Sequence, residues 1–390
     1  GVTAPGATVP GRMYSHQEIA TALATETPIA PAAPLAQLGY EPDDNLYIAV
    51  GTPDDAPVHG THVLGIAAGR AVPPPPGRPD PGCPAGVAPG ADLAFVHLRP
   101  GALVTDGEPA DVLDGVCAIF AEADLAGIPS VVNLSLGANF GPHDGSTLLD
   151  RALDAMLERP GRAIVVAAGN GGAATRHAGG PLLPGASQAL RWEFLAGDET
   201  DNTLRIFLPA PGGQLQFNCD VADPTGTVVM QSPASANPNV DLLDDGQHIV
   251  GALYAGLVPA IGAAPLQLVE LRIRPSGARD ETWTVTLQMA ANAQPGLRWD
   301  AWIDRDDRAK SASSEDRARV TASRFKQEDA EAARSLSALA CGMRTICVGA
   351  FDETSPGVPV PTGFTAVGPT RDDRQKPDVA APGAAVTAAR

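Results

Sequence analysis

Residues 163–170 read Ala-Ile-Val-Val-Ala-Ala-Gly-Asn, a short apolar run that closes on a glycine and an asparagine. A run of the same kind, Ser130-Val-Val-Asn-Leu-Ser-Leu-Gly137, precedes it, and a helical pattern from Thr147 to about Glu158 separates the two. Continuous apolar strands that alternate with helices are typical of a parallel sheet covered on both faces. We therefore predict an α/β fold for this part of the chain, with helices on both faces of the sheet.

The same alternation extends from this core in both directions. The further predicted elements are a capping-box helix that opens at Ser15-His-Gln-Glu18, a small-residue helix over 63–69, a strand over 92–98, a helix over 110–126 and a buried strand over 344–350. The last of these returns to the buried-strand pattern near the end of the chain. We therefore expect the parallel sheet to resume there after an interruption.

The interruption has a different hydrophobic pattern, because apolar and polar residues alternate strictly from about Ala189 onward. The alternating segments are Trp192–Phe194, Leu204–Leu208, Leu215–Cys219, Leu266–Ile273 and Trp283–Met289. This alternation predicts half-buried antiparallel strands. We predict an inserted β-sandwich or jelly-roll domain over 187–303 and a charged connection over 304–336, with the α/β domain formed by 1–186 and 337–390.

Charge and composition exclude several functional classes. With 27 Lys and Arg against 45 Asp and Glu, the formal charge is −18, and no run of four basic residues occurs. Such a chain lacks a basic surface for nucleic acid or anionic membranes. The uncharged stretch Ile249–Leu266 approaches the length of a membrane span, but its glycines and prolines predict strands and turns. Five scattered cysteines without a C-x-x-C pair outline neither a disulfide framework nor a zinc ribbon, and we interpret them mostly as buried thiols.

Two short motifs carry side chains suited to catalysis. His59-Gly60-Thr61-His62 opens the small-residue helix, and an imidazole of near-neutral pKa can act as a general base and acid. Asn170 closes a buried strand, where its amide is a fixed neutral donor for a developing oxyanion. Alone, each motif also fits an ordinary structural role, and His59 with His62 could form half of a zinc site. The other histidines supply no third ligand, so we assign no metal site.

Five motifs in this order resemble the subtilisin-like serine proteases. They are His59–His62, Gly86-Val-Ala-Pro-Gly-Ala-Asp-Leu93, Val131–Gly137, Ala163–Asn170 and Lys376-Pro-Asp-Val-Ala-Ala-Pro-Gly383. The longer run Val131–Asp144 resembles the bacterial branch that includes the spore-germination proteases. Members of that branch carry a jelly-roll insert between the oxyanion asparagine and the last strands of the sheet.

The resemblance implies a subtilisin-like fold and a role for each matching residue. It implies an endopeptidase that hydrolyses peptide bonds through a serine acyl-enzyme, with a protein or peptide as its substrate and no cofactor. His59 would be the general base and then the acid, and Asn170 the oxyanion donor. The implied substrate-binding residues are Ser135, Leu136, Gly137 and Gly169.

Two family motifs are absent from these 390 residues. Residues 1–58 hold no apolar strand that ends in the catalytic aspartate, and Asp43, Asp44, Asp54 and Asp55 read as solvated turn charges. The nucleophile motif G-T-S-x-A-x-P does not occur either. We expect that the chain is truncated at both ends and that these residues alone cannot run the triad mechanism.

Two other interpretations stay open. A pseudoprotease would use the same groove, or the β-rich insert, to bind a protein or peptide without cleaving it. Zinc chemistry through His59 and His62 is the third interpretation. The oligomeric state and the compartment, which for a bacterial protein is extracellular or cytoplasmic, also stay open. No signal peptide is visible, and the unpaired cysteines favour a reducing interior.

Overall fold

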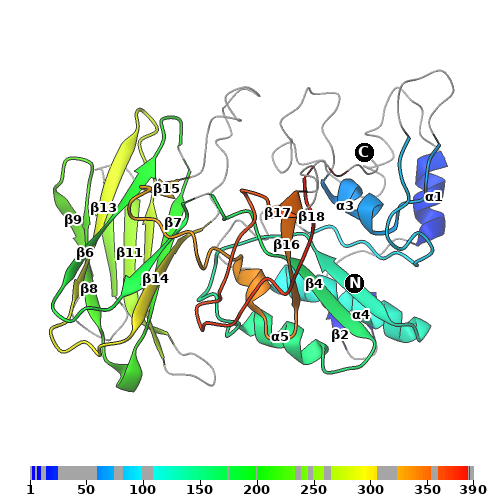
Figure 1. Cartoon of the computed structure of the whole chain (residues 1–390), viewed down its shortest axis with the longest axis horizontal. Helices are drawn as coiled ribbons and strands as arrows, with labels where there is room; N and C mark the ends of the chain where they lie inside the picture. Colours follow the sequence, from blue (N-terminus) through cyan, green and yellow to red (C-terminus); the bar gives the residue numbers. More distant parts are fainter. Residues whose placement is uncertain are drawn as a thin grey trace. The chain divides into compact units, whose positions relative to one another are not determined.

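The computed structural model describes residues 2–4, 7–9, 15–24, 59–73, 82–98, 109–173, 175–198, 200–232, 239–244, 249–258, 265–304, 323–352, 359–384 and 386 (Figure 1). The chain divides into two compact units. One comprises Gly1–Ala102, Glu108–Ser130 and Thr387–Arg390, and the other comprises Leu103–Gly107 and Val131–Val386.

The first unit contains three helices among its described residues, together with a small hairpin. The helices are α1 (His16–Ala24), α3 (His59–Ala68) and α4 (Pro109–Ala126), and the hairpin pairs β1 (Val2–Ala4) with β2 (Ala7–Val9). The predicted capping box is confirmed, because the Ser15 amide donates to Glu18 Oε2 at 2.7 Å and the Glu18 amide donates to Ser15 Oγ at 3.3 Å. The predicted helices over 63–69 and 110–126 are also confirmed.

The predicted strand over 92–98 is wrong. Within the described part of this unit these residues pair with no strand. Their apolar side chains pack against helices instead. A Cβ atom on Gly60 of α3 would lie 2.9 Å from Phe95 Cζ, and one on Gly115 of α4 would lie 3.1 Å from Val96 Cγ1. Leu93, Phe95 and Val96 nevertheless stay exposed, so this apolar run is only partly covered by the helices that it contacts.

The second unit contains the predicted parallel sheet. Its strand order is β17-β16-β4-β3, with β18 also paired to β16. The strands are β3 (Ser130–Leu134), β4 (Arg162–Ala167), β16 (Ile346–Asp352), β17 (Val360–Pro361) and β18 (Val379–Pro382). β16 runs parallel to both β4 and β18, as the buried-strand patterns predict. Helix α5 (Leu148–Met156) connects β3 to β4, and Thr147 caps it.

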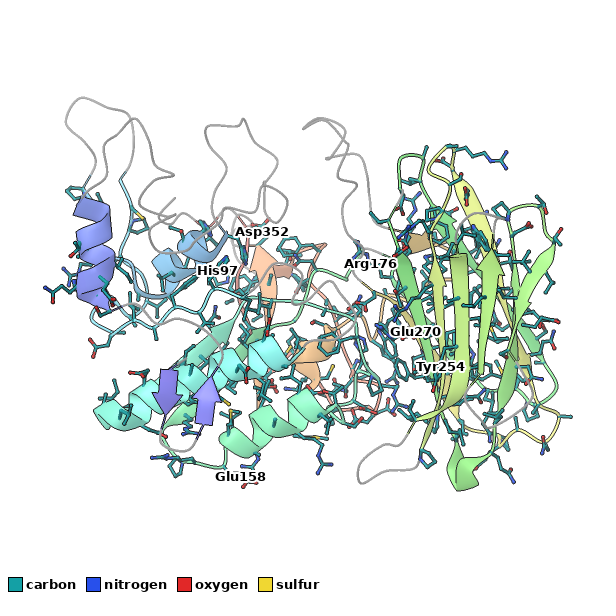
Figure 2. All side chains as sticks on the ribbon, turned by 180° about the vertical axis from the view of Figure 1, so that it is seen from behind. His97, Glu158, Arg176, Tyr254, Glu270 and Asp352 are labelled. Atoms are coloured by element: carbon teal, nitrogen blue, oxygen red, sulfur yellow. The ribbon has the colours of Figure 1, made fainter. Side chains whose placement is uncertain are left out.

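Two antiparallel sheets form the rest of this unit, in agreement with the period-two pattern (Figure 1). Their orders are β10-β11-β12-β7-β14-β5 and β15-β6-β13-β8-β9. The strands are β5 (His177–Pro181), β6 (Ser187–Phe194), β7 (Asn202–Pro209), β8 (Phe217–Ala222), β9 (Val228–Gln231), β10 (Asn239–Asp244), β11 (Ile249–Val258), β12 (Leu266–Ile273), β13 (Glu281–Met289), β14 (Arg298–Ile303) and β15 (Arg324–Phe325). In Figure 2, Tyr254 of β11 lies near its cross-strand partner Glu270 of β12.

One hydrophobic core joins the two antiparallel sheets. Trp192 and Leu190 of β6 belong to the same buried cluster as Leu204 and Ile206 of β7. The stretch Ile249–Leu266, which is long enough to suggest a membrane span, supplies β11 and the start of β12. Among the described residues, no helix has the length and apolar character that a membrane crossing requires.

The antiparallel strands interrupt the parallel sheet in sequence. Val165 of β4 pairs directly with Ile346 of β16. All the strands from β5 to β15 lie between these two neighbours along the chain.

Three cysteines, Cys219, Cys341 and Cys347, are buried, whereas Cys83 and Cys117 are half-buried. The prediction of mostly buried thiols is therefore confirmed.

Candidate functional site

The predicted substrate edge begins where β3 ends. The next residues, Ser135, Leu136 and Gly137, lie beyond the end of the strand and are half-buried. Ser135 Oγ accepts a hydrogen bond from Asn133 Nδ2 at 2.9 Å. The next residue, Ala138, is buried with an exposed fraction of 4%. The edge therefore ends at a buried residue, Ala138, whereas Ser135–Gly137 remain partly accessible to solvent.

The predicted oxyanion segment begins where β4 ends. The Ala168 amide donates to the Val348 carbonyl of β16 at 2.9 Å, which ties this end of the segment to the sheet. Gly169 has a φ of +105°, a conformation that strongly favours glycine, and its carbonyl accepts from the Ala366 amide at 2.9 Å. Asn170 follows and is exposed. Its amide group therefore projects from a fixed backbone at the end of a buried strand.

Ser337 lies between these two segments, and the sequence offered no signal for it. Its hydroxyl contacts both the amide and the carbonyl of Ala138, each at 3.1 Å. Its own amide donates to the Ala168 carbonyl at 2.7 Å. The structure thus brings Ser135–Gly137 and Gly169–Asn170 together in one unit through Ser337.

His59 lies in the other unit, as the first residue of α3, and it is exposed. Gly60 beside it faces the Phe95 ring too closely for any larger residue to fit without a shift. Outside the described residues lie the acids Asp43, Asp44, Asp54 and Asp55, and so do residues 74–81, which are part of a proline-rich segment.

A cavity of about 180 Å³ lies directly after Asn170. One side is lined by Gly171, Gly172, Ala173 and Thr175, and the other by Gln327, Ala330, Glu331 and Ala332. A Cβ atom on Gly172 would lie 2.1 Å from the Thr365 carbonyl oxygen, so this wall admits no side chain at that position. Glu331 is the charged residue of the lining.

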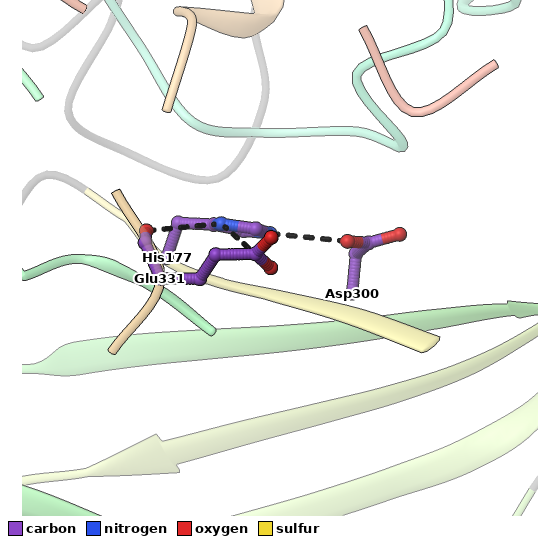
Figure 3. A group of neighbouring side chains, drawn as sticks. All are labelled: His177, Asp300 and Glu331. Atoms are coloured by element: carbon purple, nitrogen blue, oxygen red, sulfur yellow. Dashed lines mark hydrogen bonds and ion pairs between the residues drawn. The ribbon is translucent and has the colours of Figure 1, made fainter. Parts of the chain in front are cut away.

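Glu331, which is half-buried, also belongs to a cluster with the buried side chains of His177 and Asp300, shown in Figure 3. Asp300 Oδ1 lies 3.1 Å from His177 Nε2, and both side chains are 1% exposed. Glu331 Oε2 lies 4.0 Å from His177 Nδ1, at the other nitrogen of the ring. No sequence motif identifies this cluster, because 123 residues separate His177 from Asp300.

One histidine and two carboxylates form a common ligand set for a metal ion, but the geometry of this cluster does not fit one. An imidazole presents one nitrogen to a given ion, whereas here the two carboxylates approach opposite nitrogens of the ring. Arg298 already contacts both acids, through Nε to Asp300 Oδ1 at 2.8 Å and through a second nitrogen to Glu331 Oε2. The cluster is therefore an ion-pair network that joins the segment around Glu331 to β5 and β14, with His177 and Asp300 buried and Arg298 and Glu331 half-buried.

A second buried histidine lies close to the substrate edge. His143 stacks on Trp302 of β14, with ring centroids 4.0 Å apart and planes 5° apart. Its Nδ1 lies 2.8 Å from the Leu336 carbonyl oxygen, and its Nε2 lies 3.2 Å from that of Asn139. Burial lowers the pKa of His143 to about 4. The ring is thus neutral near pH 7, and we assign its single proton to Nδ1, which makes the shorter contact.

Both the sequence and the fold of this chain are similar to those of known proteins. The sequence model of the subtilase family, Peptidase_S8, matches residues 29–246. Among solved structures, the Clostridium perfringens CspB protease is similar in fold, with a TM-score of 0.70 and 21% sequence identity. The match covers 97% of this chain and 70% of the CspB chain.

Proposed function

This chain belongs to the subtilase family, and on that premise we propose that the protein is a serine endopeptidase whose substrates are proteins or peptides. The observation that carries the proposal is the end of β4. Asn170 stands exposed after a rigidly held Gly169, in one unit with the half-buried edge Ser135–Gly137. An extended peptide on that edge and an oxyanion donor beside it are two requirements of peptide-bond hydrolysis.

Each proposed site residue has one role. Asn170 donates to the oxygen that becomes negative in the tetrahedral intermediate, and removing a donor of this kind costs on the order of 3 kcal/mol in subtilisin itself. Ser135, Leu136 and Gly137 pair with substrate backbone, and Gly169 leaves room for the substrate close to the chain. His59 takes the proton from the serine nucleophile and returns it to the leaving amine.

We also propose that residues 187–303, which carry strands β6 to β14, form an inserted jelly-roll domain; β5 and β15 complete the two antiparallel sheets from outside this range. The catalytic domain would then comprise 1–186 and 337–390, with 304–336 as the connection. The direct pairing of β4 with β16 supports an insertion, because these neighbours flank all the antiparallel strands in sequence.

Substitution of His59 tests the proposed activity in the full-length protein that carries this sequence. We expect His59→Ala to reduce kcat/KM for peptide hydrolysis by at least about 10³-fold with an unchanged fold, because the nucleophile loses its base. His16→Ala is the control, since His16 is an exposed histidine on another helix, α1, of the same unit. Steady-state kinetics and circular dichroism give the two readouts. A folded His59→Ala protein with undiminished turnover would remove His59 from this role.

A fluorophosphonate probe distinguishes the proposal from its rivals. The wild-type protein should be labelled on serine, and His59→Ala should be labelled far more slowly. Peptide binding without labelling would identify a pseudoprotease that acts as a binding module. Stoichiometric zinc in the purified protein, lost on changing either His59 or His62 to alanine, would point to metal chemistry instead.

A further inference from the structure

Ser337 makes hydrogen bonds to both segments on which the proposed function depends. Its hydroxyl donates to the Ala138 carbonyl and accepts from the Ala138 amide, at 3.1 Å in each case. Its amide donates to the Ala168 carbonyl at 2.7 Å. Ala138 follows the substrate edge directly, and Ala168 directly precedes Gly169. Ser337 thus bonds to one residue beside each segment, Ala138 next to the substrate edge and Ala168 next to the oxyanion segment.

Packing reinforces these hydrogen bonds. Ser337 is 3% exposed, so water does not compete for its hydroxyl. A Cβ atom on Gly169 would lie 3.1 Å from Ser337 Cβ and 3.2 Å from Ser337 N, so the two backbones are already in close contact. The adjacent Ala338 amide adds a second hydrogen bond to the Ala138 carbonyl, at 2.8 Å. Beyond the pairing of β3 with β4 in the sheet, Ser337 therefore adds a second link between the edge and the oxyanion segment, at the point where both have left their strands.

We propose that Ser337 is a positioning residue of the endopeptidase, which holds the substrate edge and the oxyanion segment at the separation that brings a bound peptide carbonyl to Asn170. This inference rests on the proposed function. Hydrogen-bond donors stabilise an oxyanion only at about 2.7–3.1 Å, so a small change in this separation affects the transition state more than the binding of substrate. Ser337 itself need not touch the substrate.

Ser335 offers a matched control two residues away. Its hydroxyl accepts from the Val367 amide at 3.0 Å and donates to the Val367 carbonyl at 3.4 Å, which repeats the bonding of Ser337 on a different segment. Its exposed fraction is 8%. Replacing either serine with alanine removes the same two kinds of hydrogen bond, but Ala138 is buried and Val367 is exposed, so Ser335→Ala should lose less stability than Ser337→Ala.

Amide hydrogen exchange on the 390-residue chain tests the structural link without any need for activity. In Ser337→Ala the Ala138 amide should exchange at least about tenfold faster, because it loses its acceptor. In Ser335→Ala the Val367 amide should become faster and the Ala138 amide should not. Equal protection of Ala138 in the two variants would overturn the inference.

Kinetics on the full-length protein test the consequence for turnover. Ser337→Ala should lower kcat about tenfold or more while KM stays within about twofold. Ser335→Ala should lower kcat less, because its Val367 bonds reach the oxyanion segment only through the neighbouring Ala366, whose amide donates to the Gly169 carbonyl. Equal kcat values for the two variants would refute the positioning role. A wild-type protein that neither hydrolyses peptides nor reacts with a fluorophosphonate would instead overturn the proposed function, and the exchange result would still report whether Ser337 links the two segments.

Discussion

His143 is held between the segment that follows the substrate edge and the last long strand of the antiparallel sheets. It is 2% exposed, stacked on Trp302, and bonded to the Leu336 carbonyl. A charged imidazole in this position would be poorly solvated, which is the main reason that its pKa falls to about 4. His143 therefore couples protonation to folding.

The sign of this coupling predicts acid sensitivity. The folded-state pKa of about 4 lies below the ordinary value of 6.5, so the stabilisation is complete above pH 6.5 and is lost as the pH falls toward 4. The loss reaches about 3 kcal/mol. His143→Phe keeps an aromatic ring on Trp302 and removes the titration. We expect the wild-type protein to lose its stability advantage over this variant between pH 6.5 and pH 4, as measured by urea unfolding. A constant difference over that range would contradict the prediction.

Local side-chain interactions could be predicted from the sequence, and distant ones could not. The capping box joins Ser15 to Glu18 within one helical turn, so its residue types identify it. Ser337 and Ala138 are 199 residues apart, and no property of a serine in a Ser-Leu-Ser-Ala run indicates such a partner. The catalytic candidates were recognised by their motifs, whereas the residues that position them depend on the tertiary fold.

At the scale of elements, hydrophobic periodicity predicted whether a segment is a helix or a strand better than it predicted which strands pair. The strict alternation in Trp283–Met289 requires one buried and one exposed face, and β13 has this form. The apolar run over 92–98 carries no such constraint, and it packs against Gly60 and Gly115 of two helices. A strand can therefore be predicted where apolar and polar residues alternate, because the alternation assigns the side chains to opposite faces of the strand.

Helix α5 shows how one element can carry an unfavourable charge. Asp150 in its first turn is 3% exposed and bonds to Thr147 Oγ1 at 2.6 Å. Burial raises the pKa of Asp150 to about 6, with a further contribution from Asp154 one turn later. Asp154 is itself bonded to the Met343 and Arg344 amides, at 2.9 Å and 2.7 Å. The two acids therefore share one face of the helix, and only Asp150 is poorly solvated.

Asp150→Asn should stabilise the protein at pH 8. A folded pKa of about 6 against an ordinary 3.8 means that the contribution of Asp150 to stability is complete below pH 3.8 and lost as the pH rises through 6. The asparagine carbonyl keeps the bond from Thr147. We expect a gain of up to about 3 kcal/mol at pH 8, reduced by about 0.5 kcal/mol for the lost interaction with the helix dipole. Chemical unfolding at pH 8 and pH 4 measures it, and an equal gain at both values would contradict the assignment.

At the scale of the molecule, the order of the motifs along the chain predicted the parallel sheet and the interruption within it. It did not predict how the antiparallel sheets are joined to the segment that follows β3. That joint consists of single contacts, such as Asn139 Nδ2 to the Ile303 carbonyl at 2.9 Å and Trp302 Nε1 to the Arg334 carbonyl at 3.0 Å. Asp304 accepts from the Asn139 amide at 3.3 Å and also contacts Arg205 of β7. Such contacts leave no periodic pattern in a sequence.

These contacts predict that the parallel and antiparallel sheets of the second unit unfold together. Cys219 on β8 and Cys347 on β16 report on the two parts separately, because both thiols are fully buried. Burial raises the pKa of both thiols, that of Cys347 to about 12, so neither forms the reactive thiolate in the folded state. Pulsed alkylation in increasing urea, read by peptide mass spectrometry, should show both cysteines becoming reactive at one midpoint.

Asn139→Ala removes a contact of this joint while leaving both hydrophobic cores intact. We expect it to move the Cys219 and Cys347 midpoints apart, because the coupling free energy falls while the internal stability of each part is retained. Asn218→Ala is the control, since Asn218 lies on β8 away from the joint. Two separate midpoints in the wild-type protein would mean that the antiparallel sheets fold independently of the parallel sheet. A single midpoint that Asn139→Ala splits would mean that the insertion contributes to holding the substrate edge in place.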